Sequence, residues 1–180
     1  NKVSGIAFHN DYVWISTDNG IARFDLLIEQ WEKIGSNRGL IELDIKDIQI
    51  IAEDVWLISG DELINYKPRF EKWLSYKIIK KNKKKLKRIF IINNDCWLVS
   101  DSGLIRYNTL VNTQQYFNNN YLSSEKLIEI FVESSMLWAL TKEGLYSYDV
   151  SSSIWKEFQG NNFTKDIKIN NGLINQNEYW

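Results

Sequence analysis

The sequence predicts an all-β fold made of repeated antiparallel sheets, and three observations support this. First, the stretch YVWISTDNGIARFD, at residues 12–25, returns three times along the chain as DVWLISGDELINYK, CWLVSDSGLIRYN and LWALTKEGLYSYD. Second, apolar residues within each unit alternate with the two-residue period of strands. Third, the tryptophans that lead the units recur at intervals of 42, 41, 41 and 42 residues. These are Trp14, Trp56, Trp97, Trp138 and Trp180.

Other positions of the repeat keep the same spacing. An aromatic residue stands ten positions after each of the first four tryptophans, and a glycine stands six positions after three of them. The second copy has Glu62 at the glycine position and carries Gly60 two places earlier. The aromatic residues are Phe24, Tyr66, Tyr107 and Tyr148, and the glycines are Gly20, Gly103 and Gly144.

Units of 40 to 45 residues with four strands each are typical of β-propeller blades. We therefore expect four full blades and the start of a fifth, as a fragment of a larger ring. A four-stranded meander cannot bury both faces alone, so neighbouring blades should pack face to face with the aromatic positions between them. The expected blades cover about residues 3–35, 45–77, 87–118 and 127–159, and the fifth starts at about residues 167–180.

Each blade is expected to be a meander of four short strands. In the first blade, the Asp18-Asn19-Gly20 sequence predicts a tight hairpin turn, because Asn-Gly supplies the positive φ that two-residue turns require. The expected strands are 6–8, 12–17, 21–25 and 30–34 in the first blade, and 48–52, 55–59, 63–66 and 72–76 in the second. They are 88–92, 96–100, 104–107 and 114–117 in the third, and 127–132, 137–141, 145–148 and 155–158 in the fourth. The fifth blade should begin with a strand at 167–174, followed by residues 178–180.

Composition argues against nucleic acid and membrane as partners. The chain has 22 basic and 23 acidic side chains, so it has no strong overall field for an anionic partner. Eight Lys or Arg residues lie between Lys77 and Arg88, and we interpret this run as a solvated loop because no aromatic residues interrupt it. No apolar run is long enough to span a bilayer, and the start of the chain does not resemble a signal peptide. Because the chain does not start with Met, we expect it to be a piece of a longer protein.

The residue inventory does not favour an enzyme. The chain has one histidine, His9, which we place in a surface turn, and one cysteine, Cys96, which we expect to be a buried core thiol. It lacks a nucleophile elbow, a His/Cys metal spacing and a phosphate-binding glycine loop. We therefore expect no catalytic residues, no metal and no cofactor.

Polar residues at the turns between second and third strands are the candidate ligand-binding group. These turns should share one rim of the propeller with the connections between blades, and loops on a rigid scaffold often carry function. The alternative is turn chemistry alone, because Asp and Asn favour such bends. Two arginines, nine residues after their tryptophans, are further candidates for an anionic ligand, although outward positions in a strand would look the same. The candidates are Asp18, Asn19, Asp61, Asp101, Glu143, Arg23 and Arg106.

The run WISTDNGIARFD, with WLVSDSGLIRYN and WALTKEGLYSYD, resembles the two-component regulator propeller repeat. The resemblance covers essentially the whole chain. In the second copy, SGDELINYK lacks the turn glycine at the usual place and the closing Asp, so a reshaped loop is expected there.

The resemblance implies the extracytoplasmic, periplasmic or extracellular, sensor region of a hybrid histidine kinase, whose kinase activity would lie outside this segment. The expected partners are a small molecule or glycan, or another protein, with a homodimer through the full-length protein as a further arrangement. Two alternatives remain. One is a scaffold propeller for protein assembly. The other is an enzyme similar to streptogramin lyases, which use His, Glu and a magnesium ion.

Overall fold

The computed structural model describes residues 2–34, 44–78, 85–92, 94–101, 103–117, 122, 127–133, 136–149, 151–158, 174–175 and 178–179. The chain is all-β, and its first sixteen strands form four antiparallel sheets of four strands, each in sequence order. Sheet one holds β1 (Val3–His9), β2 (Tyr12–Thr17), β3 (Gly20–Asp25) and β4 (Gln30–Ile34), and sheet two holds β5 (Ile45–Ile51), β6 (Asp54–Ser59), β7 (Glu62–Lys67) and β8 (Lys72–Lys77). Sheet three holds β9 (Leu86–Ile92), β10 (Asp95–Ser100), β11 (Gly103–Asn108) and β12 (Thr113–Phe117), and sheet four holds β13 (Leu127–Glu133), β14 (Met136–Thr141), β15 (Leu145–Asp149) and β16 (Ile154–Glu157).

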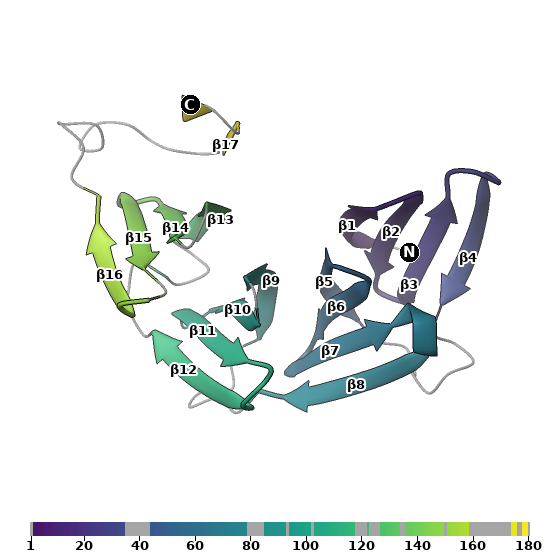
Figure 1. Ribbon diagram of the computed structural model, residues 1–180, viewed down its shortest axis with the longest axis horizontal. Helices are drawn as coiled ribbons and strands as arrows, with labels where there is room; N and C mark the ends of the chain where they lie inside the picture. Colours follow the sequence, from purple (N-terminus) through teal and green to yellow (C-terminus); the bar gives the residue numbers. More distant parts are fainter. Residues whose placement is uncertain are drawn as a thin grey trace.

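The four sheets stand around a common centre as the blades of a propeller (Figure 1). The first strand of each sheet, β1, β5, β9 or β13, faces the centre, and the fourth strand lies outermost. This confirms the predicted fold class. Past blade 4, β17 (Ile174–Asn175) pairs with β18 (Glu178–Tyr179), whereas residues 167–173 of the expected fifth-blade strand lie outside the described residues.

Helix is confined, among the described residues, to one short 3-10 turn, η1 (Pro68–Phe70), between β7 and β8. It holds the chain's one proline at a place where no ladder hydrogen bond is needed. No helix in the described part of the chain has the length and apolar character needed to cross a membrane.

A hydrophobic core lies between each pair of neighbouring blades, and each blade of the pair contributes one face to it. Each core joins the tryptophan-bearing face of one blade to the opposite face of the next. Between blades 1 and 2 it contains Trp14, Ile21, Ile34, Ile45, Ile48, Val55, Leu57, Ile64 and Tyr66. Between blades 2 and 3 it contains Trp56, Ile58, Leu63, Ile78, Leu86, Ile89, Cys96, Leu98, Ile105 and Tyr107. Between blades 3 and 4 it contains Trp97, Val99, Leu104, Leu127, Ile130, Leu137, Ala139, Tyr146 and Tyr148, together with Ile92 and Leu122.

The aromatic positions of the repeat meet across these cores. Trp14 lies edge-on to Tyr66 of the next blade, with ring centroids 6.4 Å apart, and Trp97 lies edge-on to Tyr148 at 5.0 Å. Edge-to-face pairs of this kind stabilise a core by roughly 0.5–1.5 kcal/mol beyond the area that they bury. The leading tryptophan and the aromatic residue ten positions after it therefore belong to two opposite faces of the blade, and the repeat joins each blade to both neighbours.

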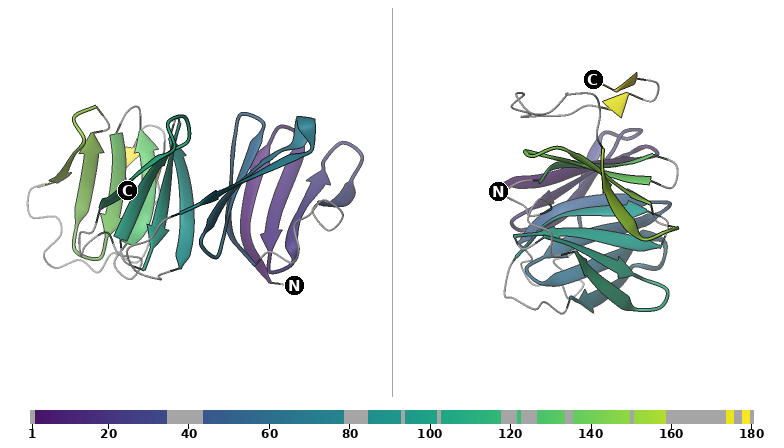
Figure 2. Two further views of the ribbon diagram at one scale, coloured as in Figure 1. Left: turned by 90° about the horizontal axis from the view of Figure 1, so that it is seen from below. Right: turned by 90° about the vertical axis from the view of Figure 1, so that its left-hand side faces the viewer.

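The turns collect at two rims, because each meander runs back and forth across the thickness of the molecule (Figure 2). One rim carries the turns between second and third strands, the ends of the fourth strands and the starts of the first strands, and we call it the crossover rim. The other carries the turns between first and second strands and between third and fourth strands, and we call it the cleft rim.

The second-to-third strand turn of blade 1 differs from the predicted form. Thr17 pairs with Gly20 across the turn, and the positive φ of 100° lies at Gly20 rather than at Asn19. A glycine with positive φ after two ordinary turn residues is the arrangement of a type I turn with a bulge. The Thr17 hydroxyl completes the turn by donating to the Gly20 carbonyl at 3.0 Å and accepting from the Asn19 backbone N–H at 3.0 Å.

Blade 2 has the reshaped turn that the sequence predicts. Ser59 pairs with Glu62, and Gly60, at the first position between them, has a φ of 56°. A type II′ turn has its glycine at this first central position. The displaced glycine of the second copy therefore changes the turn type, while the two strands keep their pairing.

Candidate functional site: clefts between the blades

The predicted turn residues lie on the crossover rim, one blade at a time. Asp18 and Asn19 share the turn of blade 1, and Asp61, Asp101 and Glu143 occupy the corresponding turns of blades 2, 3 and 4. The Asp18 carboxylate accepts a hydrogen bond from the Lys2 backbone N–H at 3.2 Å. The Lys87 ammonium lies 3.5 Å from the Asp101 carboxylate. The clefts described below are lined by other residues, so a ligand role for these five residues stays a prediction.

The two predicted arginines extend from the third strands of their blades, directly opposite the leading tryptophans. Arg23 pairs with Trp14 in the ladder, and Arg106 pairs with Trp97. Each guanidinium lies over its tryptophan ring, 5.7 Å from the ring centroid. Cations over indole faces are attracted by the ring quadrupole. The two side chains are therefore held against the aromatic face of the blade.

Each arginine also has a carboxylate partner within its own blade. The Arg23 guanidinium is 2.7 Å from Glu32, and the Arg106 guanidinium is 2.5 Å from Asp95 and 3.3 Å from the Tyr148 hydroxyl. Burial disfavours the charged form of Arg106, but the hydrogen bond and charge of Asp95 outweigh it and raise the pKa of Arg106 above its usual value.

Two clefts open on the cleft rim between consecutive blades. The first cleft, between blades 1 and 2, has a volume of about 290 Å³, and the second cleft, between blades 2 and 3, has about 700 Å³. Their linings are related by the repeat: Trp14 and Arg23 in the first cleft occupy the positions of Trp56 and Asn65 in the second. The same surface therefore recurs from blade to blade with different side chains.

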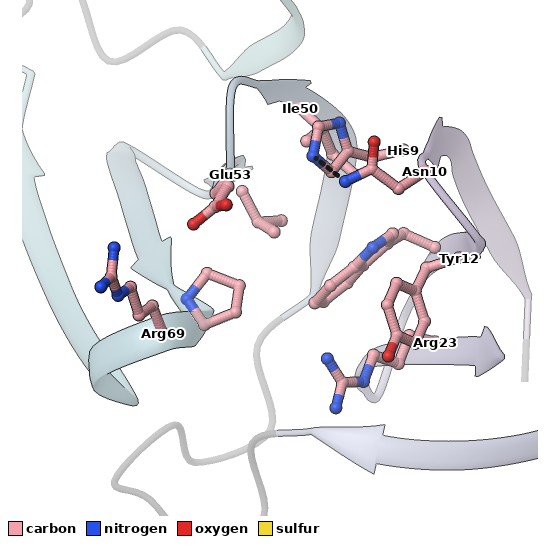
Figure 3. Close-up of a pocket in the computed structure, with 10 residues that line it drawn as sticks. His9, Asn10, Tyr12, Arg23, Ile50, Glu53 and Arg69 are labelled. Atoms are coloured by element: carbon pink, nitrogen blue, oxygen red, sulfur yellow. Dashed lines mark hydrogen bonds between the residues drawn. The ribbon is translucent and has the colours of Figure 1, made fainter.

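The first cleft carries charged groups on both of its walls (Figure 3). Blade 1 contributes His9, Tyr12 and Arg23, and blade 2 contributes Glu53 and Arg69. The Arg23 guanidinium lies 4.7 Å from the Tyr12 ring centroid, and His9 Nε2 is 3.1 Å from Asn10 Nδ2. Two guanidinium groups, an imidazole and a carboxylate can bind a polar ligand through several hydrogen bonds at once.

The second cleft combines polar and apolar side chains. Glu53 and Arg69 line it as they line the first cleft, so the two clefts meet at the turns of blade 2. The Lys67 ammonium lies 2.6 Å from the Asp54 carboxylate at its side. Its lining consists of Ile51, Ala52, Glu53, Asp54, Trp56, Asn65, Lys67, Arg69, Tyr76, Ile91, Asn94, Cys96, Thr109 and Leu110.

Sequence reasoning selected Arg23 but missed most of the cleft residues. Glu53, Arg69 and Asn65 stand in turns or strands with no motif of their own. One sequence signal could have indicated cleft residues: the position nine residues after the leading tryptophan is polar in three successive blades, where it holds Arg23, Asn65 and Arg106. Side chains of His, Cys, Asp and Glu do not gather in groups of three or more that could hold a metal ion, as far as the described residues go.

Comparisons with known proteins show the fold of this chain. No family model matches it, and no curated protein matches it. It is similar to the extracellular domain assigned to the hybrid two-component system BT4673 from B. thetaiotaomicron, with a TM-score of 0.69 and 16% identity over 96% of this chain and 25% of that one. The corresponding domain of BT3049 from the same organism has a TM-score of 0.61 and 15% identity, over 88% of this chain and 24% of that one. Virginiamycin B lyase from Staphylococcus aureus has a TM-score of 0.68 and 15% identity, over 90% of this chain and 57% of that one. The chain thus spans about a quarter of the BT4673 domain.

Proposed function

We propose that this chain is part of a non-enzymatic β-propeller that binds a ligand, as the extracytoplasmic sensor region of a two-component system. The tryptophan-led repeat and the likeness to extracellular domains assigned to hybrid two-component systems support the sensor role. The observation that carries the binding role is the first cleft, which Arg23 lines from blade 1 and Arg69 lines from blade 2. A ligand that spans the two blades could report its presence by changing how they pack.

The ligand of the first cleft is proposed to be a small polar molecule or a glycan. Its hydroxyl or carboxylate oxygens would accept from the guanidinium groups, and Tyr12 and Trp14 offer aromatic surface beside them. Most ligand sites combine a few placed polar groups with such apolar walls.

Binding to the purified chain tests this proposal. A library of small organic acids and oligosaccharides is screened by thermal shift, and each hit is titrated calorimetrically against the wild type and Arg23→Gln. Lys72→Gln, on the exposed outer strand β8, serves as the charge-matched control. We expect a hit whose affinity falls about tenfold or more in Arg23→Gln and is unchanged in Lys72→Gln. Absence of any hit, or equal affinity in all three proteins, contradicts a ligand site in the first cleft. Breakdown of the ligand on addition of Mg²⁺ supports the lyase-like alternative instead.

A scaffold role is the second candidate, and a row of exposed apolar residues on the cleft rim favours it. The third-to-fourth strand turns of blades 1, 2 and 3 present bulky side chains to solvent, whereas blade 4 has Ser151 and Ser152 there. Exposed apolar residues gathered on one face often mark protein interfaces. A pull-down that loses its partner when this row is changed to serine, with no effect of Arg23→Gln, would favour assembly over sensing. The row consists of Leu27, Ile28, Phe70, Leu110 and Val111.

A further inference from the structure

The second cleft contains a buried hydrogen-bond donor that has no partner in the described part of the chain. Asn65, on β7, is 1% exposed and lines the cleft. Among the residues that the structure describes, none accepts a hydrogen bond from its Nδ2 atom. Buried polar groups are nearly always paired, so an unpaired one in a native protein calls for an explanation.

The residues at the same repeat position in the neighbouring blades have carboxylate partners. Arg23 in blade 1 is held by Glu32, and Arg106 in blade 3 is held by Asp95. Both partners are carboxylates supplied by the same blade. Asn65 stands at the corresponding position of blade 2 and has no such carboxylate partner among the described residues.

The reason lies in two other differences of blade 2, Leu74 where blade 1 has Glu32 and Lys67 where blade 3 has Asn108. Leu74 faces Asn65 across the ladder where blade 1 has Glu32, so no side-chain acceptor comes from β8. Asp54 stands where blade 3 has Asp95, but its Oδ2 atom binds the Lys67 ammonium at 2.6 Å. The Asn65 amide is thus left without a carboxylate partner, buried in the wall of the cleft.

The charges around the cleft compensate one another. Two carboxylates, Glu53 and Asp54, stand beside two cations, Lys67 and Arg69. A lining of this kind gives no net attraction for a charged ligand. We therefore expect an uncharged ligand that offers a hydrogen-bond acceptor to Asn65.

Exposed apolar side chains at the cleft favour a ligand that also has an apolar group. Ile51 is 40% exposed and Leu110 is 73% exposed, and both line the cleft. A ligand with an apolar group would cover these side chains, which is favourable in water. A ligand bearing hydroxyl groups there would instead lose hydration without gaining partners.

We propose that the second cleft binds an uncharged amide, such as a capped peptide segment with an apolar side chain. The amide carbonyl accepts a hydrogen bond from Asn65 Nδ2, and the apolar side chain lies against Ile51 and Leu110. This inference rests on the proposed binding function and gives it a second site with its own ligand class.

The test uses N-acetyl-leucine amide as the probe and maltotriose as the uncharged comparison. Each is titrated into the isotopically labelled chain while the side-chain amide resonances of Asn65 are followed. We expect saturable shifts with N-acetyl-leucine amide alone. Shifts with maltotriose alone overturn the ligand class, and no shift with either compound overturns the site.

Variants separate a binding role of Asn65 from a structural one. Asn65→Leu keeps the branched shape of the side chain and removes the unpaired amide, so we expect at least about a tenfold loss of probe affinity and an unchanged or higher melting temperature. Arg23→Gln, in the first cleft, should leave probe binding intact. A lowered melting temperature with unchanged probe affinity in Asn65→Leu contradicts the inference. A library hit that depends on Arg23 but not on Asn65, with no binding of the probe, leaves the proposed function standing and removes this inference alone.

Discussion

Cys96, on β10, is a core residue of the interface between blades 2 and 3. It is fully buried, and burial raises the pKa of its thiol to about 12, with the nearby Asp95 carboxylate adding to the effect. The thiolate is the reactive form of cysteine. The sequence-based expectation of a buried thiol is therefore confirmed.

We predict that native Cys96 does not react with a thiol reagent at pH 8. Its reaction with an aromatic disulfide reagent should be slower by orders of magnitude in buffer than in concentrated urea. Absorbance of the released thiolate measures both rates. Rapid reaction in buffer would show that the interface between blades 2 and 3 opens readily.

Asp47, on β5, joins blade 2 to blade 3. Its Oδ2 atom accepts the Ile89 backbone N–H at 2.9 Å, and Oδ1 accepts the N–H of Ile48 at 2.9 Å. Burial raises the pKa of this carboxyl, while the two N–H groups and the charge of Arg88 act in the opposite direction. The folded protein therefore binds the Asp47 proton more tightly than the unfolded chain does.

The sign of the resulting pH dependence follows from linkage. The stability that protonated Asp47 contributes is fully present below its ordinary pKa of 3.8 and is lost as the pH rises through its raised pKa. We predict that the free energy of unfolding of the wild type, relative to Asp47→Asn, falls between pH 3 and neutrality. Urea titrations of both proteins across this range measure the difference. A difference that grows with pH would mean that Arg88 and the N–H groups outweigh burial.

At the scale of the elements, the turn between the third and fourth strands is fixed by one side chain. Asp149 Oδ1, at the end of β15, accepts the backbone N–H of Ser151 at 2.9 Å and of Ser152 at 3.4 Å. Asp25 and Asn108 make the same pair of bonds in blades 1 and 3. The Asp that closes the repeat is thus a turn-forming residue, in the way that Asx turns use it.

We predict that Asp149→Ala destabilises blade 4, whereas Asp149→Asn is tolerated, because Asn108 already does this work in blade 3. Hydrogen bonds from the Ser151 hydroxyl and backbone lower the pKa of Asp149 to about 2. The stability that its carboxylate contributes is present above the ordinary value of 3.8 and is lost as the pH falls toward about 2. Thermal unfolding of the three proteins between these pH values checks both statements, and identical acid profiles for wild type and Asp149→Asn would contradict them.

Turn chemistry shows where sequence reasoning succeeds and where it stops. Glycine and Asx signals predicted the hairpins, including the altered turn at Gly60. The residue before each fourth strand also has a positive φ, between 51° and 57°, but it is not a glycine in any blade, so the sequence gives no sign of it. All four residues are exposed, so the geometry of the turn, and not side-chain packing, imposes this conformation. The four residues are Glu29, Glu71, Asn112 and Ser153.

The clefts were harder to predict than the blades for a related reason. A blade is a local pattern that repeats, so its strands and core positions can be read from one copy and checked against the others. A cleft needs residues from two blades, such as Arg23 with Arg69 or Glu53, that lie tens of positions apart. Each of them is an unremarkable strand or turn residue, and their proximity follows from how the blades pack.

At the scale of the whole molecule, the account depends on blades that stack face to face. Ile48 and Ile89 occupy the same repeat position in blades 2 and 3, and both are buried against the preceding blade. Ile6 is their counterpart in blade 1, where no preceding blade covers it in the described part of the chain, and it is 56% exposed. Three equivalent isoleucines therefore differ in burial because of blade packing alone.

Comparing Ile48→Ala with Ile6→Ala by urea unfolding tests this stacking most directly, and both proposed clefts depend on it. We predict that Ile48→Ala lowers the free energy of unfolding by about 2–5 kcal/mol, as for a buried large-to-small change, and that Ile6→Ala lowers it by less than about 1 kcal/mol. Equal losses in the two variants would contradict the account, since they would show that these isoleucines have the same surroundings and that the sheets do not pack as successive blades.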